Sequence, residues 1–201
     1  MIERYTNPEM GNIWTLQHEF ETMLEVEIAA CEAMAELGEI PQEAAANIRA
    51  KAKFDLPRVK EIEKVTNHDI IAFLTNVAEY VGEDSKYIHK GLTSSDVKDT
   101  ALGIMMKKSA DIIIDATAKY YRIKISDILG KKRTRNIARP RQVAMSLTKE
   151  LTNLSLPSIG DAFGGRDHTT VMHGVKAVAK LREDDPELAQ DYEKLLIMIQ
   201  N

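Results

Sequence analysis

The sequence is poor in cysteine, in aromatic residues and in long apolar runs. Its 201 residues include a single cysteine, Cys31, and 5% aromatic residues. One cysteine excludes an intramolecular disulfide and any cysteine-based zinc finger, and it indicates a reducing compartment. No apolar run approaches the roughly 20 residues that span a bilayer, and the polar N-terminus has no apolar segment typical of a secretory signal. We therefore predict a cytoplasmic protein with no membrane partner.

The chain also has no motif for a nucleotide or a metal. The phosphate-binding pattern G-x-x-x-x-G-K-[ST] does not occur, so ATP-driven switching is not expected. We predict no cofactor and no metal site.

The net charge of −4 hides a division between the two halves of the chain. Residues 1–110 carry 12 basic and 19 acidic residues, whereas residues 111–201 carry 15 and 12. Residues 119–182 contain 14 basic side chains and only four acidic ones. Such asymmetry favours a module that binds a polyanion. A solvated basic face explains the charge alone equally well.

Apolar residues recur at helical spacing along the chain, and no segment alternates as a strand does. We predict an all-α fold of two helical modules, residues 1–110 and 111–201. The expected helices cover 14–37, 42–53, 56–62, 68–80, 112–121, 141–151, 156–163, 167–182 and a last segment after Pro186. Ser94 or Ser95 is expected to cap a further helix, Ser126 to cap a short turn, and Pro140 to open the helix of 141–151. Residues 99–121 contain no proline, so one helix can run through both modules.

Residues 155–180 have the pattern of a helix-turn-helix. A short helix is followed by Gly164 and Gly165, which permit a sharp turn, and then by a longer helix. Three valines of the second helix share one face and are expected to pack against Ile159 and Phe163; they are Val171, Val175 and Val178. The residues left exposed at the start of this helix are Asp167, His168, Thr169 and Thr170. In DNA-binding proteins this position contacts base edges, but an ordinary helical corner with Asp167 as N-cap fits the same pattern.

A basic segment lies upstream of that motif. Six positive charges occur in eleven residues without an acid; they are Lys131, Lys132, Arg133, Arg135, Arg139 and Arg141. A loop of this charge, predicted over residues 131–136, can follow a phosphate backbone or insert one arginine into a narrow minor groove. Gln142 and Lys149, on the next helix, occupy polar positions that can contact phosphate as well.

These residues carry a resemblance. The segments 120–125, 131–135, 138–145 and 149–157, and above all I-G-D-A-F-G-G-R-D-H-T-T-V-M-H at 159–173, resemble the C-terminal DNA-binding domain of the DnaA family of bacterial replication initiators. The resemblance covers residues 111–201. It implies a helix-turn-helix that binds the duplex nine-base DnaA box, without the ATPase module of that family.

The resemblance also implies roles for individual residues. Asp167, His168 and Thr169 would contact bases in the major groove. Arg133 would enter the minor groove, and Pro157 would add an apolar base contact. The implied phosphate contacts are Arg141, Gln142, Lys149 and Thr170, and His173 also lies among the implied DNA-binding residues.

The first module contains two histidines near the starts of helices, His68 and His89. Thr93, Ser94 and Ser95 precede a helix and could bind an anion through their hydroxyls and free N–H groups. Structural histidines and simple helix caps account for the same residues.

The segments 1–6, 25–33, 52–55, N-H-D-I-I-A-F (67–73) and Y-I-H-K-G-L-T-S-S-D-V (87–97) resemble the N-terminal domain of adenylosuccinate lyase, of the fumarase/aspartase superfamily. This resemblance covers residues 1–110. It implies that the substrate-contacting residues are Arg4, Tyr5, Asn67, His68, Asp69, Thr93 and Ser94, with His68 and His89 as lyase-like histidines.

The lyase family also needs a downstream histidine, a serine on a mobile loop and a long helical bundle, and this chain changes identity before them. General acid–base catalysis requires both proton-transfer groups in position, so no lyase turnover is expected from the chain alone. Three functions are therefore compared: sequence-specific binding of double-stranded DNA, adenylosuccinate lyase activity, and a non-catalytic helical scaffold that forms a homo-oligomer through the first module. The first is preferred, in a fusion of two modules.

Overall fold

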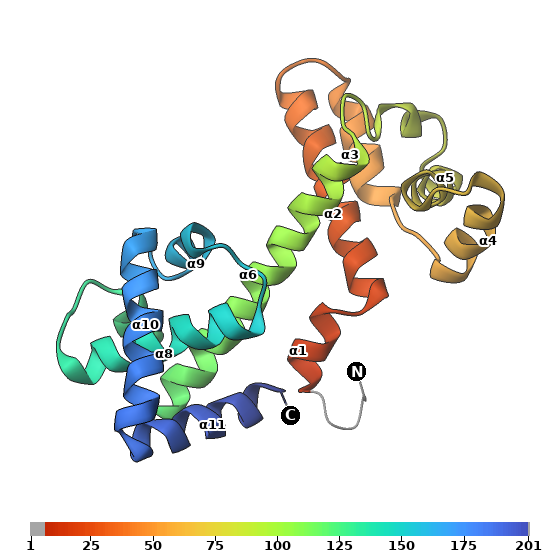
Figure 1. Cartoon of the computed structure of the whole chain (residues 1–201). Helices are drawn as coiled ribbons and strands as arrows, with labels where there is room; N and C mark the ends of the chain where they lie inside the picture. Colours follow the sequence, from red (N-terminus) through yellow and green to blue (C-terminus); the bar gives the residue numbers. More distant parts are fainter. Residues whose placement is uncertain (1–6, 201) are drawn as a thin grey trace. The chain divides into compact units, whose positions relative to one another are not determined.

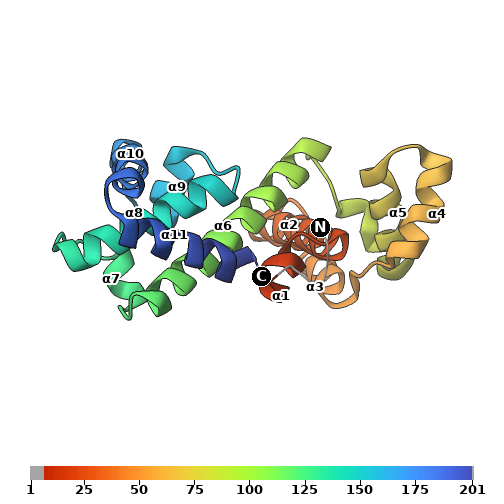
Figure 2. The same ribbon diagram turned by 60° about the horizontal axis from the view of Figure 1, so that its bottom comes forward.

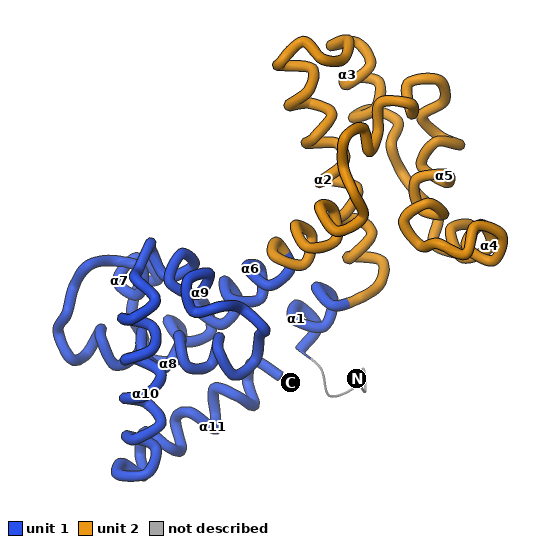
Figure 3. Tube along the Cα trace, turned by 45° about the horizontal axis from the view of Figure 1, so that its top comes forward, with its two compact units in different colours: residues 1–14, 105–201 blue, residues 15–104 orange. Residues whose placement is uncertain are grey.

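A computed structural model describes residues 7–200, which form α-helices and one 3-10 helix and contain no β-strand (Figure 1). The all-α prediction is confirmed for this part of the chain. Contacts divide the chain into two compact units, residues 15–104 (unit 2) and residues 1–14 with 105–201 (unit 1), coloured orange and blue in Figure 3. Over the described residues, no helix combines the length and hydropathy needed to cross a lipid bilayer.

Unit 2 is a helical unit with one apolar core. Its elements are α2 (Leu16–Glu36), α3 (Gln42–Lys51), α4 (Leu56–Thr66), α5 (Asp69–Val81), the 3-10 helix η2 (Gly82–Tyr87) and the first part of α6 (Ser94–Tyr120). Three phenylalanines meet in its core, with centroids 5.1 Å apart for Phe20 and Phe73, 5.7 Å for Phe54 and Phe73, and 5.8 Å for Phe20 and Phe54. Burial and two nearby carboxylates raise the pKa of the Cys31 thiol to about 11, so this side chain packs as a neutral group.

Unit 1 contains the rest of α6 and five later helices. They are α7 (Ile125–Leu129), α8 (Arg135–Leu151), α9 (Leu156–Ala162), α10 (His168–Asp184) and α11 (Pro186–Gln200). Figures 1 and 2 show α10 crossing α8 and lying beside α9. One apolar cluster joins α7, α9 and the start of α10 through Ile128, Ile159 and Val171, and a second joins α8 to α11 through Leu147 and Tyr192.

Helix α1 (Pro8–Ile13) belongs to unit 1 although it is distant in sequence. The Asn7 backbone N–H donates to the Gln200 carbonyl at 2.9 Å, and its side-chain amide donates to the Met198 carbonyl at 3.3 Å. Met10 packs against the second apolar cluster. The structural division, with a break between Ile104 and Met105, thus does not follow the sequence modules 1–110 and 111–201 at these places.

Two predicted helix starts are corrected. The helix expected over 14–37 begins two residues later, at Leu16: Thr15 adopts an extended conformation and caps the helix, because its hydroxyl accepts from the His18 N–H. Helix α6 begins at Ser94 itself, so neither Ser94 nor Ser95 is the cap. Thr93 precedes the helix, and Asp96 accepts from its N–H at 2.7 Å and from its hydroxyl at 2.8 Å.

The segment around Pro140 is also corrected. The proline does not open a helix but lies inside α8, which begins at Arg135. Ile137 and Pro140 are both buried, and this burial outweighs the one backbone hydrogen bond that a proline cannot donate. Ser126 is likewise inside α7, whose N-cap is Lys124.

Helix α6 confirms the hypothesis of one helix through residues 99–121, since it runs without interruption from Ser94 to Tyr120. The chain therefore passes from unit 2 to unit 1 within a helix rather than through a loop.

Candidate nucleic-acid interface

Helices α9 and α10 form a helix-turn-helix. The Ser155 hydroxyl accepts from the Ser158 N–H at 3.2 Å and starts α9. Gly164 and Gly165 have φ angles of 85° and 71°, which favour glycine, and they complete the predicted turn. Val171 and the half-buried Val175 pack in the cluster of Ile159 and Phe163. The prediction was wrong for Val178, which lies two turns beyond Val171 and packs in the second cluster, against α8 and α11.

The first turn of α10 is exposed at every predicted reading position: Asp167, His168, Thr169 and Thr170. Asp167 is the N-cap, because its Oδ1 accepts from the Thr169 N–H at 2.8 Å and from the Thr169 hydroxyl at 2.5 Å. These bonds hold the pKa of the Asp167 carboxyl below its usual range. Both bonds end on Oδ1, so Oδ2 can accept from an outside donor. The cap and a base contact are therefore compatible.

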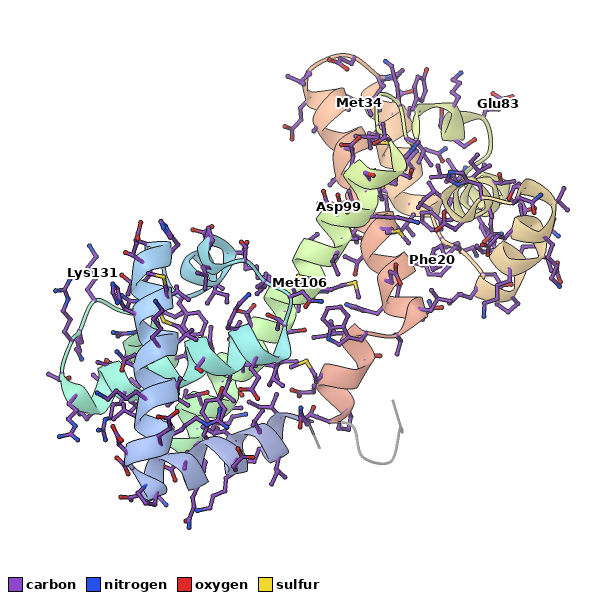
Figure 4. The ribbon with its side chains drawn as sticks, in the orientation of Figure 1. Phe20, Met34, Glu83, Asp99, Met106 and Lys131 are labelled. Atoms are coloured by element: carbon purple, nitrogen blue, oxygen red, sulfur yellow. The ribbon has the colours of Figure 1, made fainter. Side chains whose placement is uncertain are left out.

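A basic loop, residues 131–134, joins α7 to α8. Its four residues are exposed, and Figure 4 shows the Lys131 side chain extending away from the ribbon. Lys132 pairs with Asp127 at 2.9 Å, and this bond holds the pKa of the Asp127 carboxyl below its usual range. The loop is shorter than predicted, because residues 135 and 136 already belong to α8. The Arg133 side chain remains free to reach outward from this loop.

Arg141, which the resemblance assigns to a phosphate contact, is buried within unit 1. The residue is only 5% exposed. Its guanidinium donates to four backbone carbonyls at the end of α7 and in the basic loop; they belong to Asp127, Ile128, Gly130 and Lys132. Four of the five N–H groups of the side chain are thus engaged within the protein, which leaves one for an outside acceptor.

The other predicted contacts differ in exposure. Lys149 is exposed and donates to the Leu154 carbonyl at 3.3 Å. Pro157, near the start of α9, and His173, on α10, are exposed as well. Gln142 is half-buried on α8, where its Cγ lies 3.4 Å from the position that a Cβ would take at Gly174. The predicted residues thus lie on the helix-turn-helix, the basic loop and α8, all within one unit.

Sequence reasoning missed Arg166 and Gly160. Arg166 donates to the Leu129 carbonyl at 3.4 Å and to the Gly130 carbonyl. Its own N–H donates to the Gly160 carbonyl at 2.8 Å, and a Cβ at Gly160 would overlap the Arg166 carbonyl oxygen. One signal was available in the sequence: glycine inside a helix lowers stability, so its presence in a short helix indicates that another part of the backbone packs closely there.

In unit 2, the residues of the N-H-D segment take different structural roles. Asn67 ends α4 with a left-handed φ of 52°. His68 is the N-cap of α5, because its Nδ1 accepts from the Ile71 N–H at 3.4 Å. Asp69 pairs with Lys98, one turn beyond Ser94 on α6, and the hydrogen bond from Lys98 helps to hold the pKa of the Asp69 carboxyl below its usual range, although partial burial opposes it. This ion pair connects the starts of α5 and α6.

His89 has its own partner. The buried carboxylate of Glu27 accepts from the His89 backbone N–H at 3.0 Å and lies 2.6 Å from its ring Nδ1. These bonds accompany a φ of 63° at His89. The two predicted histidines therefore bond to different groups. Arg4 and Tyr5 lie outside the described residues, and within residues 7–200 no group of three or more His, Cys, Asp or Glu side chains could hold a metal ion.

Two family models match the chain. The model described as "Bacterial dnaA protein helix-turn-helix" matches residues 110–178, and the model described as "Lyase" matches residues 3–126. The matches overlap over residues 110–126, in the second half of α6 and the segment after it.

Curated relatives carry names of both kinds. The "Chromosomal replication initiator protein DnaA" of Neisseria meningitidis serogroup B is 74% identical over 126 residues, covering 60% of this chain and 24% of the relative. "Adenylosuccinate lyase" of Synechocystis sp. is 61% identical over 119 residues, 59% of this chain and 28% of the relative. The Bacillus subtilis protein of that name is 54% identical over 114 residues, covering 57% and 26%. The chain spans about a quarter of the length of these relatives.

Among solved structures, a fumarate lyase from Mesorhizobium sp. BNC1 has a TM-score of 0.57 at 18% identity, covering 85% of this chain and 47% of that chain. At this identity the likeness concerns the helical fold alone.

Proposed function

The chain belongs to the lyase family through residues 3–126 and carries a match to the bacterial DnaA helix-turn-helix at residues 110–178, and we propose that residues 111–201 bind duplex DNA sequence-specifically at DnaA-box sites. The observation that carries this proposal is the exposed first turn of α10, which presents His168, Thr169 and Thr170 beside an unused carboxylate oxygen of Asp167. Helix-turn-helix proteins place this turn against base edges in the major groove.

Each exposed group has a matching contact on DNA. Asp167 accepts from cytosine N4, and the Thr169 methyl contacts a thymine methyl. Arg133, from the basic loop, enters the minor groove, where negative potential attracts arginine. Pro157 adds an apolar base contact. The groups assigned to phosphate or to the flanking backbone are Gln142, Lys149, Thr170 and His173, which set the register of the protein on the duplex.

We expect the chain to bind a duplex containing one DnaA box at least about 10³-fold more tightly than a scrambled duplex of equal length. The measurement is a paired fluorescence-anisotropy titration repeated at several salt concentrations. The logarithm of the affinity should fall with the logarithm of salt, with a slope of about −0.9 for each phosphate neutralised. Equal affinity for both duplexes at moderate salt would contradict the proposal.

Two alanine variants should separate base contacts from phosphate contacts. His168→Ala should weaken binding to the box by about 1–3 kcal/mol and leave the scrambled duplex almost unaffected, because the imidazole faces base edges. Lys149→Ala should weaken both duplexes to a similar extent and make the salt slope shallower by about one. Both side chains are exposed, so neither change should alter the melting temperature. A uniform loss in His168→Ala would assign that residue to the backbone instead.

The lyase-family segment is proposed to be non-catalytic in this chain. The acid and the base of a proton-transfer reaction must both be in position, and after residue 110 this chain continues with the DnaA-like module.

A second role proposed for unit 2 is self-association. Large apolar side chains are well exposed on it; they include Leu37 (76%), Val65 (82%) and Ile71 (50%). Exposed apolar groups favour association when they form a continuous surface. We expect sedimentation velocity to show a species larger than the 22.6 kDa monomer at micromolar protein, and Val65→Lys to shift it toward the monomer. A strictly monomeric profile of the unmodified chain would contradict this role.

A further inference from the structure

Several backbone carbonyls at the end of α7 and in the basic loop accept hydrogen bonds from one side chain, that of Arg141. Arg141 Nε donates to the Ile128 carbonyl at 2.5 Å, and its Nη1 donates to the Lys132 carbonyl at 2.8 Å. Nη2 donates to the carbonyls of Asp127 at 2.7 Å and Gly130 at 2.9 Å. These acceptors lie on both sides of the point where the chain leaves α7. A single arginine of α8 thus bonds to backbone carbonyls at the end of α7, at Gly130 and at Lys132 of the basic loop.

A second arginine reaches the same place from the helix-turn-helix. Arg166 donates to the Leu129 and Gly130 carbonyls, so the Gly130 oxygen accepts from both arginines. The turn also packs closely against this backbone segment: a Cβ at Gly164 would overlap the carbonyl oxygen of Leu129. The turn before α10 is therefore joined directly, by hydrogen bonds and close backbone packing, to Leu129 and Gly130, which immediately precede the basic loop.

Arg133 lies within electrostatic reach of this arrangement. Burial, and after it the positive charge of Arg133, lower the pKa of Arg166, while burial and the charge of Arg166 lower the pKa of Arg141. Like charges this near repel one another, and the carbonyl acceptors offset that repulsion. Arg133 itself has an exposed side chain and belongs to the loop, next to Lys132, whose carbonyl accepts from Arg141.

We propose that Arg141 and Arg166 form a clamp on the carbonyls of residues 127–132, which orders the basic loop before DNA arrives and sets the position of Arg133. This inference rests on the proposed function and deepens it: the two arginines are positioning residues for minor-groove specificity, and they are not phosphate contacts. A loop ordered in advance loses less conformational freedom on binding. Both grooves are then read in one fixed register, because the clamp ties the loop to the turn that starts α10.

The test replaces Arg141 by lysine, which keeps the charge but cannot span four carbonyls. We expect the ratio of affinities for the box and the scrambled duplex to fall by at least about tenfold, with the scrambled affinity and the salt slope unchanged. A phosphate contact predicts a different result, in which the ratio is kept or both duplexes weaken alike. That result would overturn the clamp. Arg122→Lys is the matched control, since this arginine is exposed in the same unit, and it should leave the ratio unchanged.

A double-mutant cycle with Arg133 tests the route of the effect. If Arg141 acts through Arg133, Arg141→Lys should have no further effect on the ratio in an Arg133→Ala background. Additive losses would overturn the inference. Should Arg141→Lys lower the melting temperature so far that the chain is unfolded at the assay temperature, the same cycle with Arg166→Lys decides, because Arg166 makes fewer of the carbonyl bonds.

A measurement without DNA separates this inference from the proposed function. Amide order parameters of residues 131–134 should be near 0.85 in the unmodified chain and below about 0.6 in Arg141→Lys. A mobile loop in the unmodified chain, or an equally ordered loop in the variant, would overturn the clamp whatever the DNA result. An ordered loop in a chain that does not discriminate between the duplexes would contradict DNA-box binding and leave the clamp standing.

Discussion

Replacing Gly160 by alanine should destabilise unit 1 by about 3 kcal/mol or more, at the upper end of the range for overpacked cores. The glycine is buried inside α9, and a Cβ there would overlap the Arg166 carbonyl oxygen, which is backbone and cannot rotate away. The backbone of Gly160 and Arg166 also forms a hydrogen bond that closes the turn, since the Arg166 N–H donates to the Gly160 carbonyl oxygen at 2.8 Å. Relief of the overlap therefore separates α9 from the turn that positions α10.

The measurement is thermal unfolding followed by circular dichroism. For a unit of about 100 residues, a loss of this size lowers the melting temperature by at least about 10 °C. Gly103→Ala is the control: Gly103 is also helical, no atom beyond its own stretch of helix backbone lies within 4 Å of the added Cβ, and the change should stabilise the chain by about 0.5–1 kcal/mol. An unchanged melting temperature in Gly160→Ala would show that α9 and the turn can move apart at little cost.

The helices could be predicted because their apolar spacing is local information. Val171 and Ile159 were assigned to one core from spacing alone, and the structure confirms it. Helix ends were less predictable, because burial competes with local signals there. Pro140 is a residue typical of the first position of a helix. The observed helix α8 nevertheless begins earlier, at Arg135, and so includes the buried Ile137. Thr15 caps α2, so this helix begins two residues later than its apolar periodicity predicts.

The exposed first turn of α10 was expected from the helix-turn-helix pattern, and the resemblance then assigned roles to its residues; Asp167 caps the helix there, and all four side chains are exposed. Arg141 shows where sequence reasoning fails. Within a basic segment its charge resembles that of Lys131 or Arg133, and only the packing of α8 against α7 reveals that it is buried. The need for glycine at position 160 could not be predicted either, because it comes from a tertiary contact: the turn places the Arg166 carbonyl oxygen against α9, where a Cβ at Gly160 would overlap it.

Replacing Tyr192 by alanine should destabilise unit 1 by about 3–5 kcal/mol, as other large-to-small core changes do. The ring is fully buried between α8 and α11, and the Arg182 guanidinium of α10 lies 4.0 Å from its centroid. The hydroxyl donates to Glu150 at 2.8 Å and lies 3.2 Å from the Ser146 hydroxyl. One side chain thus ties together the three helices that support the proposed interface, so specific DNA binding should fall with stability.

Tyr192→Phe is the matched variant that keeps the ring and removes the hydroxyl. We expect it to cost only about 1 kcal/mol, the usual net value of one hydrogen bond. Burial, with the nearby Glu150 carboxylate, raises the pKa of Tyr192 above its ordinary value of about 10. A raised folded pKa means that stability is complete below pH 10 and falls above it, because the unfolded chain ionises first. Urea unfolding at pH 8 and pH 11 should therefore show a smaller alkaline loss in Tyr192→Phe than in the unmodified chain, and equal losses would show that the phenol is solvated in the folded state.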